Sequence, residues 1–207
     1  MQTSFLLLVL ITVAAAVAGG GYAIESPKYT VIHSESDFEI RLYAESSWMS
    51  ALVRGTSFQE STKDGFHRLY QCIHGANVNN TEFPMTSPVL TSISQSSSES
   101  VYVVRYFLSS EHENSPPEPY PELDLELDKW KSQCMAVRKF SGFAKDDNIE
   151  EEKDSLVSSL KKHSTEEITA DENAYSIAQY NASFHLTDRL NEVWIDVLGF
   201  TAEGCPA

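Results

Sequence analysis

The sequence lacks the short motifs that identify most enzymes. It has no GxSxG nucleophile elbow, no P-loop, no HExxH zinc motif, no CxxC pair and no GxGxxG fingerprint. No metal-site spacing is found among its six histidines, which are His33, His67, His74, His112, His163 and His185. His67 and His74 lie seven residues apart on a predicted helix, a spacing more typical of a solvated flank than of metal ligation. No nucleophile and base can be paired from the sequence, so we expect a protein that is not an enzyme.

Basic residues are scarce. The 207 residues include 15 Lys and Arg against 30 Asp and Glu, which gives a formal net charge of −15. A surface of this charge repels phosphate backbones and anionic lipid, so we expect no nucleic-acid partner.

Charged residues are absent from the first 23 positions. An apolar run from Phe5 to Ala18, interrupted only by Thr12, is followed by three glycines. This pattern predicts a secretory signal peptide over residues 1–23, cleaved after Ala18 in an A-x-A pattern or after Ala23. The alternative is an uncleaved membrane anchor, since about 20 apolar residues span a bilayer. The glycines and the lack of a basic flank favour cleavage, with no stable membrane insertion afterwards.

Two N-x-S/T sequons agree with export. They begin at Asn79 and Asn181, which we predict as glycosylation sites.

Cysteine is also scarce. The chain has three cysteines, and in an oxidising compartment an odd number favours one bridge and one free thiol. Cys72 falls on a predicted helix, where a small apolar thiol packs well, whereas Cys205 lies in a short tail that would otherwise fray. We therefore predict a disulfide between Cys134 and Cys205, with Cys72 free.

Side-chain alternation predicts the strands. The stretch FEIRLY, residues 38–43, places Phe38, Ile40 and Leu42 on one face and Glu39, Arg41 and Tyr43 on the other, the pattern of a half-buried strand. Seven further stretches are predicted as strands: residues 48–55, 88–93, 101–108, 123–130, 134–144, 174–181 and 191–200.

Two helices are predicted between these strands. A capping box from Ser57 to Glu60 opens the first, and Gly75 is a plausible stop. Its expected apolar stripe is Phe66, Leu69, Tyr70 and Ile73. The second has acidic residues 150–152 in its first turn and basic residues 161–163 in its last, as the helix dipole favours. Its expected inward residues are Ile149, Leu156, Val157 and Leu160.

The predicted order is ββαββ, given twice. The two halves also match locally, because WMSALVRGTSF and CMAVRKFSGFA each precede a helix. Such repetition indicates two similar units around a common core, since neither half has enough apolar surface for its own. We expect an α+β fold, an eight-stranded, mostly antiparallel barrel with two helices outside, as a single domain over residues 24–207.

Five stretches resemble the SOUL family of heme-binding proteins, in family order. They are ESPKYTVIHSESDFEIRLYAESSWMSA, GFHRLYQCIHGAN, FPMTSPVLTSI, WKSQCMAVRKFSGFAKDDN and AQYNASFHLTDRLNEVWIDV. The chain is most similar to the plant branch with a signal peptide. The resemblance implies a distorted barrel and reversible, non-covalent binding of heme or other tetrapyrroles in a hydrophobic cleft. With the signal peptide it implies a carrier or buffer in the secretory pathway, ending in the extracellular space (apoplast) or the vacuole.

The resemblance also implies a set of binding residues. In the family the cleft is associated with the first helix and with the loop before the last strand. Those positions correspond here to Lys63, Phe66 and Tyr70, and to Phe184, His185 and Arg189. Aromatic faces can cover a flat macrocycle, and Lys63 and Arg189 can meet its propionates.

Leu42 departs from some members of the family. They carry a histidine there that is a proposed iron ligand, whereas a leucine cannot coordinate iron. Binding is then either mainly apolar, or a side chain such as His185 supplies the ligand.

Two other function classes are open. An interaction or signalling protein could keep the fold without the ligand, and an enzyme could use a similar barrel for hydrolysis. A heme titration distinguishes an interaction protein from a carrier. Turnover of a tetrapyrrole ester would reveal an enzyme.

Overall fold

The computed structural model describes residues 24–95, 100–163, 169–170, 174–181, 187–198 and 205. The predicted signal peptide, Phe184 and His185 lie outside these residues. The elements are β1 (Tyr29–Ser34), β2 (Glu39–Tyr43), β3 (Ser46–Gly55), α1 (Phe58–Ile73), β4 (Val89–Gln95), β5 (Ser100–Phe107), η1 (Pro121–Leu123), β6 (Leu125–Trp130), β7 (Gln133–Ser141), α2 (Ile149–His163), β8 (Thr169–Ala170), β9 (Ala174–Gln179) and β10 (Leu190–Leu198).

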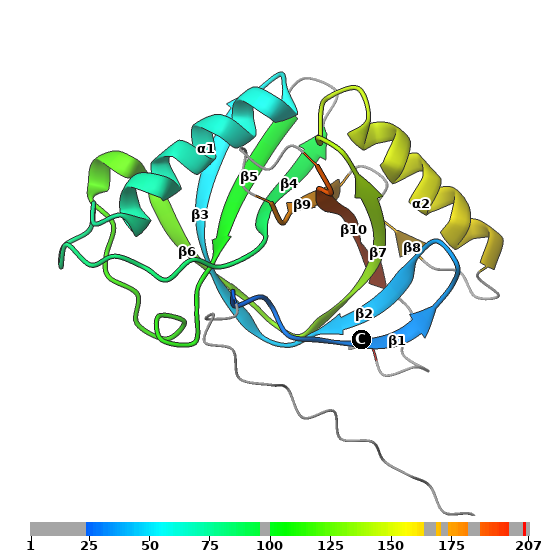
Figure 1. Cartoon of the computed structure of the whole chain (residues 1–207), viewed down its shortest axis with the longest axis horizontal. Helices are drawn as coiled ribbons and strands as arrows, with labels where there is room; N and C mark the ends of the chain where they lie inside the picture. Colours follow the sequence, from blue (N-terminus) through cyan, green and yellow to red (C-terminus); the bar gives the residue numbers. More distant parts are fainter. Residues whose placement is uncertain are drawn as a thin grey trace, which may run out of the picture.

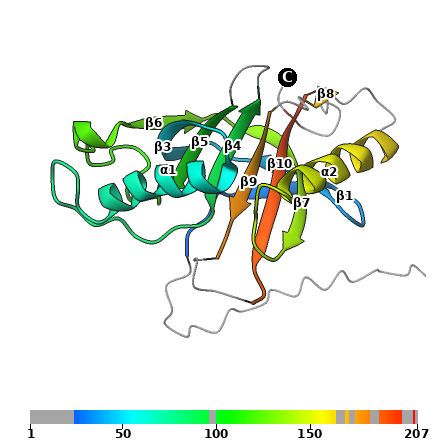
Figure 2. The ribbon, with the colours of Figure 1, turned by 90° about the horizontal axis from the view of Figure 1, so that it is seen from above.

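The strands form one curled sheet. Nine of them follow the order β1-β2-β7-β10-β9-β4-β5-β3-β6, all neighbours being antiparallel, and the short β8 pairs with β10. Both helices lie on the outer face of the curl (Figures 1 and 2). This confirms the predicted α+β fold with a barrel-like sheet, although the described strands form a half-barrel with two strands more than predicted, β1 and the two-residue β8. The side chains of β1 are mostly exposed, so that no buried face marks this strand in the sequence.

The strand order shows how the two halves are joined. In the first half β3, β5 and β4 lie side by side, and in the second half β7, β10 and β9 do the same, with β4 paired to β9 at the junction. The first strand of each half is exchanged, because β2 pairs with β7 and β6 pairs with β3. From β2 to β6 the order is therefore symmetric, as a duplicated unit requires.

Alternation along the strands sends apolar side chains to both faces of the sheet. We call the clusters on the helix-covered face the α1 cluster, which contains Met49 and Leu69, and the α2 cluster, which contains Ile195 and Leu156. The face away from the helices carries the inner cluster. Its buried members are Tyr43, Trp48, Leu90, Phe107, Met135, Val137, Ala178 and Trp194.

Helix α1 begins at the predicted cap. The hydroxyl of Ser57 accepts a hydrogen bond from the Glu60 N–H, and the Asp146 carboxylate accepts bonds from the N–H groups of Phe58 and Gln59. Asp146 comes from the segment before α2. The start of α1 is therefore stabilised by the other half of the chain.

The buried face of α1 differs from the predicted stripe. It consists of Phe58, Ser61, Gly65, Leu69, Cys72 and Ile73. A Cβ atom at Gly65 would lie 2.5 Å from Cγ2 of Val104, so the helix contacts the sheet through its smallest residue. Tyr70, a member of the predicted apolar stripe, does not belong to this buried face, because 48% of it is exposed. An apolar pattern cannot reveal a contact face made by glycine and serine.

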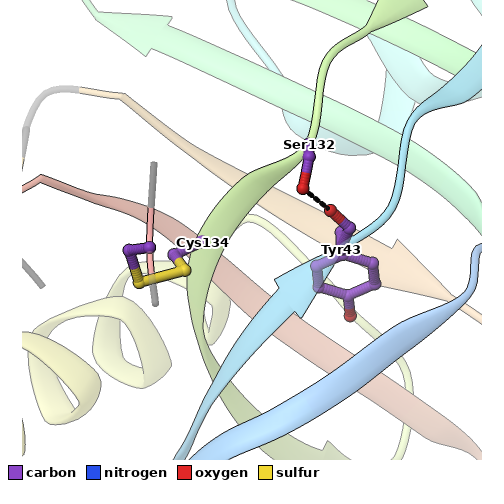
Figure 3. The surroundings of a disulfide bond; sticks show 4 residues. Tyr43, Ser132 and Cys134 are labelled. Atoms are coloured by element: carbon purple, nitrogen blue, oxygen red, sulfur yellow. Dashed lines mark hydrogen bonds between the residues drawn. A yellow bond between two sulfur atoms is a disulfide. The ribbon is translucent and has the colours of Figure 1, made fainter. Parts of the chain in front are cut away.

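The disulfide joins Cys134 of β7 to Cys205, and Cys72 is free and buried. The predicted pairing is confirmed. Beside the bridge, the hydroxyl of Ser132 donates a hydrogen bond to the backbone carbonyl of Tyr43, which ties β7 to β2 (Figure 3). Cys205 is thus part of the α2 cluster.

In the described ranges of the chain, neither helix is long and apolar enough to cross a membrane.

Candidate functional site

The predicted residues of α1 lie together on one flank of the helix. Phe66 and Tyr70 are one turn apart, their ring centroids 6.2 Å from each other, and Lys63 lies one turn earlier. Phe66 is half-buried and packs against the α1 cluster, whereas Tyr70 and Lys63 are exposed. The flank is therefore an aromatic surface with a lysine at one end.

His74 extends this flank at the end of the helix. Its ring stacks on Tyr70 with a centroid distance of 3.9 Å and an interplanar angle of 28°. Its Nδ1 atom lies 2.9 Å from the carbonyl oxygen of Tyr70. Because a carbonyl oxygen only accepts, Nδ1 is the protonated nitrogen.

Apolar side chains are also exposed in the segments that follow α1. Val78 is 59% exposed and Met85 is 62% exposed. The chain between them returns to the helix, because the Phe83 N–H donates to the carbonyl of Ile73. Beyond Met85, Thr86 donates its hydroxyl to the Phe107 carbonyl and its N–H to the Tyr106 hydroxyl, which fixes this segment on β5.

Arg189 is the predicted binding residue of the loop before β10 that the structure describes. Its environment differs from that of the α1 flank. Its guanidinium lies 4.4 Å from the ring centroid of Phe143 and donates to the backbone carbonyl of Asn181 at 3.0 Å. The side-chain oxygen of Asn181 accepts from the Leu190 N–H at 2.7 Å. Only 6% of Arg189 is exposed. These contacts place Arg189 beside the segment between β7 and α2, where its burial keeps it from solvent.

The strongest polar cluster of the described chain lies on the inner face of the sheet. Arg41 Nη1 donates a hydrogen bond to Glu192 Oε2 at 3.1 Å, and Nη2 makes an ion-pair contact of 3.0 Å with Glu192 Oε1. Glu192 Oε2 also accepts from the Tyr180 hydroxyl at 2.7 Å and from Trp194 Nε1 at 2.8 Å. Arg41 Nε donates to Glu39 as well. We call these five residues the Arg41 network.

Burial and charge shift the pKa values in the Arg41 network. Burial of Arg41 opposes its ionised form, but the adjacent Glu192 carboxylate outweighs this effect and raises the pKa of Arg41. Burial and the same carboxylate raise the pKa of Tyr180, which is therefore held as a neutral donor. Glu192 Oε2 accepts three hydrogen bonds from the protein and Oε1 pairs with the Arg41 guanidinium, so the network acts as a clamp between β2 and β10 rather than as an open site.

The network corrects the interpretation of β2 as a half-buried strand. Ile40 is fully buried on one face, and Arg41, 1% exposed, is buried on the other.

Leu42 packs against the α2 cluster and pairs with Cys134, whereas Phe66 packs against the α1 cluster. Leu42 thus lies on the α2 side, not beside the aromatic flank of α1.

In the described residues, no group of three or more His, Cys, Asp or Glu side chains could hold a metal ion.

A family model for the SOUL heme-binding protein matches residues 24–196. The chain belongs to the SOUL family. Heme-binding protein 2 of Homo sapiens is similar to this SOUL chain, with 29% identity over 188 residues, 87% of this chain and 90% of the human one. Heme-binding protein 1 of Xenopus laevis is 26% identical over 160 residues, 76% of this chain and 82% of its own.

Among solved structures, the EcmrR C-terminal domain shares the fold of this SOUL chain. The TM-score is 0.54 at 10% identity, covering 82% of this chain and 98% of that domain. At this identity the likeness concerns the fold alone.

Sequence reasoning missed two features of this SOUL domain. The contact of His74 with Tyr70 follows from their i, i+4 spacing next to the predicted stop at Gly75, a signal the sequence does contain. The Arg41–Glu192 pair joins residues 151 positions apart, and no local pattern reveals it.

Proposed function

We propose that this SOUL protein binds heme and other tetrapyrroles reversibly and acts as a carrier or buffer. The observation that carries the proposal is the flank of α1, where the half-buried Phe66 and the exposed Tyr70 form an aromatic surface next to Lys63, in a chain of a heme-binding family. A flat macrocycle that covered Tyr70 would remove apolar surface from water, the main favourable contribution to binding.

Charge affects both the affinity for the ligand and the orientation of the bound ligand. The net charge of −15 opposes an anionic ligand, so apolar contact has to dominate the affinity. Lys63 offers an exposed ammonium group to a propionate at one end of the flank. Arg189, which is buried beside Phe143, stays a predicted second partner of the propionates.

The cysteines support non-covalent binding. Cys134 and Cys205 are bonded to each other, and Cys72 is fully buried. None of the three offers an accessible thiol for attachment to a vinyl group. A bound tetrapyrrole would therefore be free to dissociate, as a carrier requires.

The test is a titration of the mature chain with metal-free protoporphyrin and with hemin. About half of the Tyr70 side chain is available to a ligand, so covering it would contribute about 1 kcal/mol of apolar burial to the binding free energy. Tyr70→Ala removes this contribution, and we therefore expect about fivefold weaker binding of both ligands. Phe66→Ala is expected to weaken both as well. Gln71→Ala is the matched control, because Gln71 is exposed on the same helix but on another face. Binding of neither ligand to the wild type would reject the function and favour an interaction protein.

We also propose that the chain enters the secretory pathway, is cleaved after Ala18 or after Ala23, and resides in the apoplast or the vacuole. Asn79 is exposed after α1, whereas Asn181 is half-buried with its side-chain oxygen engaged by Leu190. We therefore expect glycan on Asn79 in preference to Asn181. Mass spectrometry of protein from its own secretory pathway tests this, and an intact Met1 on an unglycosylated product would contradict it.

A further inference from the structure

We propose that protonation of His67 and His74 makes tetrapyrrole binding on the α1 flank tighter in mild acid than at neutral pH. This inference rests on the proposed function and adds to it a regulation of the same site. The ligand groups that the two protonated imidazoles recognise are the propionates at the rim of the macrocycle.

The two histidines share a line along the helix with the residues already assigned to the flank. The members of this line follow one another at i, i+4, i+7 and i+11, and all are exposed: Lys63, His67, Tyr70 and His74. The backbone N–H of His74 donates to the carbonyl oxygens of Tyr70 and Gln71 at 3.2 and 3.3 Å, so the helical spacing extends to His74. The line is about 16 Å long, with one histidine on each side of Tyr70 and Lys63 at one end.

The ring of His74 is oriented for a contact at the rim of a macrocycle. It stacks on the Tyr70 ring with a centroid distance of 3.9 Å and an interplanar angle of 28°. The N–H groups of an imidazole lie in the plane of its ring, so they run nearly parallel to a macrocycle that covers Tyr70, in the direction of its edge. Nδ1 donates to the Tyr70 carbonyl at 2.9 Å, and the proton gained in acid is therefore on Nε2. The protonated ring offers Nε2–H to a propionate as a charged donor.

The charge of the flank depends on these two rings. At neutral pH the protein, with its net charge of −15, repels an anionic ligand, and Lys63 is the permanent cation of the line. Imidazole is the side chain that changes its charge between about pH 8 and pH 5. Acidification within this range adds two positive charges next to the surface that covers the macrocycle.

Other titratable groups near the two histidines are carboxylates and one buried imidazole. Glu60 and Asp64 are exposed on the same helix, and Glu82, also exposed, forms an antiparallel backbone bridge with His74. Glu118 is exposed on the segment that pairs with the chain after the helix, through its carbonyl and the Val78 N–H. Exposed carboxylates stay ionised above about pH 5.5.

The buried imidazole is His112, whose ring stacks on Phe83 at a centroid distance of 4.6 Å. Its burial keeps it from a ligand on the helix surface. The change in charge at the flank therefore comes from His67 and His74.

The experiment is a titration of the full mature chain with metal-free protoporphyrin at about pH 7.5 and about pH 5.5, followed by porphyrin fluorescence. Exposed ion pairs are individually weak, so two new pairs are expected to tighten binding about fivefold in acid. This ratio is expected to shrink in about 1 M salt, which screens exposed charges. Protoporphyrin dimethyl ester, which has no free carboxylate, is expected to bind equally at both pH values.

Paired substitutions test the two histidines. His67→Gln with His74→Gln is expected to reduce the ratio of the two affinities to about one. His67→Lys with His74→Lys places permanent charges there and is expected to bind at neutral pH about as tightly as wild type binds in acid, a rescue that a purely structural role would not give. His33→Gln with His163→Gln is the matched control, because both residues lie beside Glu35, on β1 and α2, and its ratio is expected to equal that of wild type.

Four results would overturn the inference while porphyrin binding upheld the proposed function. They are equal affinity of wild type at both pH values, an unchanged ratio in His67→Gln with His74→Gln, loss of the ratio in the control pair, and the same ratio for the dimethyl ester. If wild type bound protoporphyrin at neither pH, the function and the inference would both be rejected.

Discussion

Removing Arg41 is expected to destabilise the fold strongly. The side chains of Arg41 and Glu192 are 1% and 3% exposed, so Arg41→Met leaves a buried carboxylate without its counter-charge. Tyr180 and Trp194 still donate to Glu192, but both are neutral. Breaking one side of a buried ion pair costs about 3–5 kcal/mol, a large part of the ~5–15 kcal/mol that stabilises a typical domain.

A substitution of Glu192 tests whether the destabilisation caused by Arg41→Met comes from the loss of the buried ion pair. Glu192→Gln keeps an oxygen that accepts from Tyr180 and Trp194 but removes the charge. We therefore expect the double variant, Arg41→Met with Glu192→Gln, to be more stable than Arg41→Met alone, with a coupling of about 2 kcal/mol. Lys139→Met is the control, because Lys139 lies 3.5 Å from Glu39 but is 53% exposed, and its loss should cost less than about 1 kcal/mol.

Urea unfolding followed by tryptophan fluorescence gives these free energies. We expect a lower midpoint with an unchanged m-value for Arg41→Met, because the surface exposed on unfolding stays the same. A cost below about 1 kcal/mol for Arg41→Met, or additive effects in the double variant, would show that the clamp between β2 and β10 does not stabilise the fold.

Three further predictions follow from the same contacts. Replacing Cys134 and Cys205 by serine is expected to cost about 4 kcal/mol in urea unfolding, because the bridge closes a loop of 71 residues; an unchanged midpoint would contradict this. Burial raises the pKa of Cys72 to about 11, so the thiol should stay unmodified by thiol reagents until the protein unfolds, and rapid labelling of the native chain would argue against its burial. The Ser159 hydroxyl lowers the pKa of Asp37 below its ordinary 3.8, so Asp37 stabilises the fold above about pH 4, and this contribution is lost as the pH falls through the folded pKa. Asp37→Asn should therefore reduce stability at pH 7 more than at pH 3; an equal loss at both would refute the linkage.

Local patterns in the sequence predict where the helices and strands lie better than they predict which residues these elements contact. The cap at Ser57 and the acidic and basic ends of α2 locate both helices, since these signals lie within a few residues of each other. The contact face of α1 could not be predicted, because Gly65 packs on Val104 only after the sheet has formed.

The site shows the same difference between local and long-range information. The α1 flank follows from helical spacing, so the neighbouring rings of Phe66 and Tyr70 could be predicted from the sequence, whereas their binding of a ligand stays a prediction from the family resemblance. Burial of Arg41 depends on Glu192, a residue from the other end of the chain, and a charged residue in an alternating strand otherwise predicts a solvated face.

The exchange of β2 and β6 between the halves affects how the chain can be synthesised. Strand β2 emerges early, but β7, which binds its second edge, follows much later; the Ser132 hydroxyl that reaches the Tyr43 carbonyl comes 89 residues after it. Until then the first half presents open edges on both β2 and β3, and Trp48 lacks its contact with the Trp130 ring of β6. Distant strand pairings of this kind slow folding, and open edges promote aggregation of a growing chain. A nascent first half would therefore depend on folding helpers until its second half arrived, and truncation between β5 and β6 would leave an incomplete sheet rather than a smaller working domain.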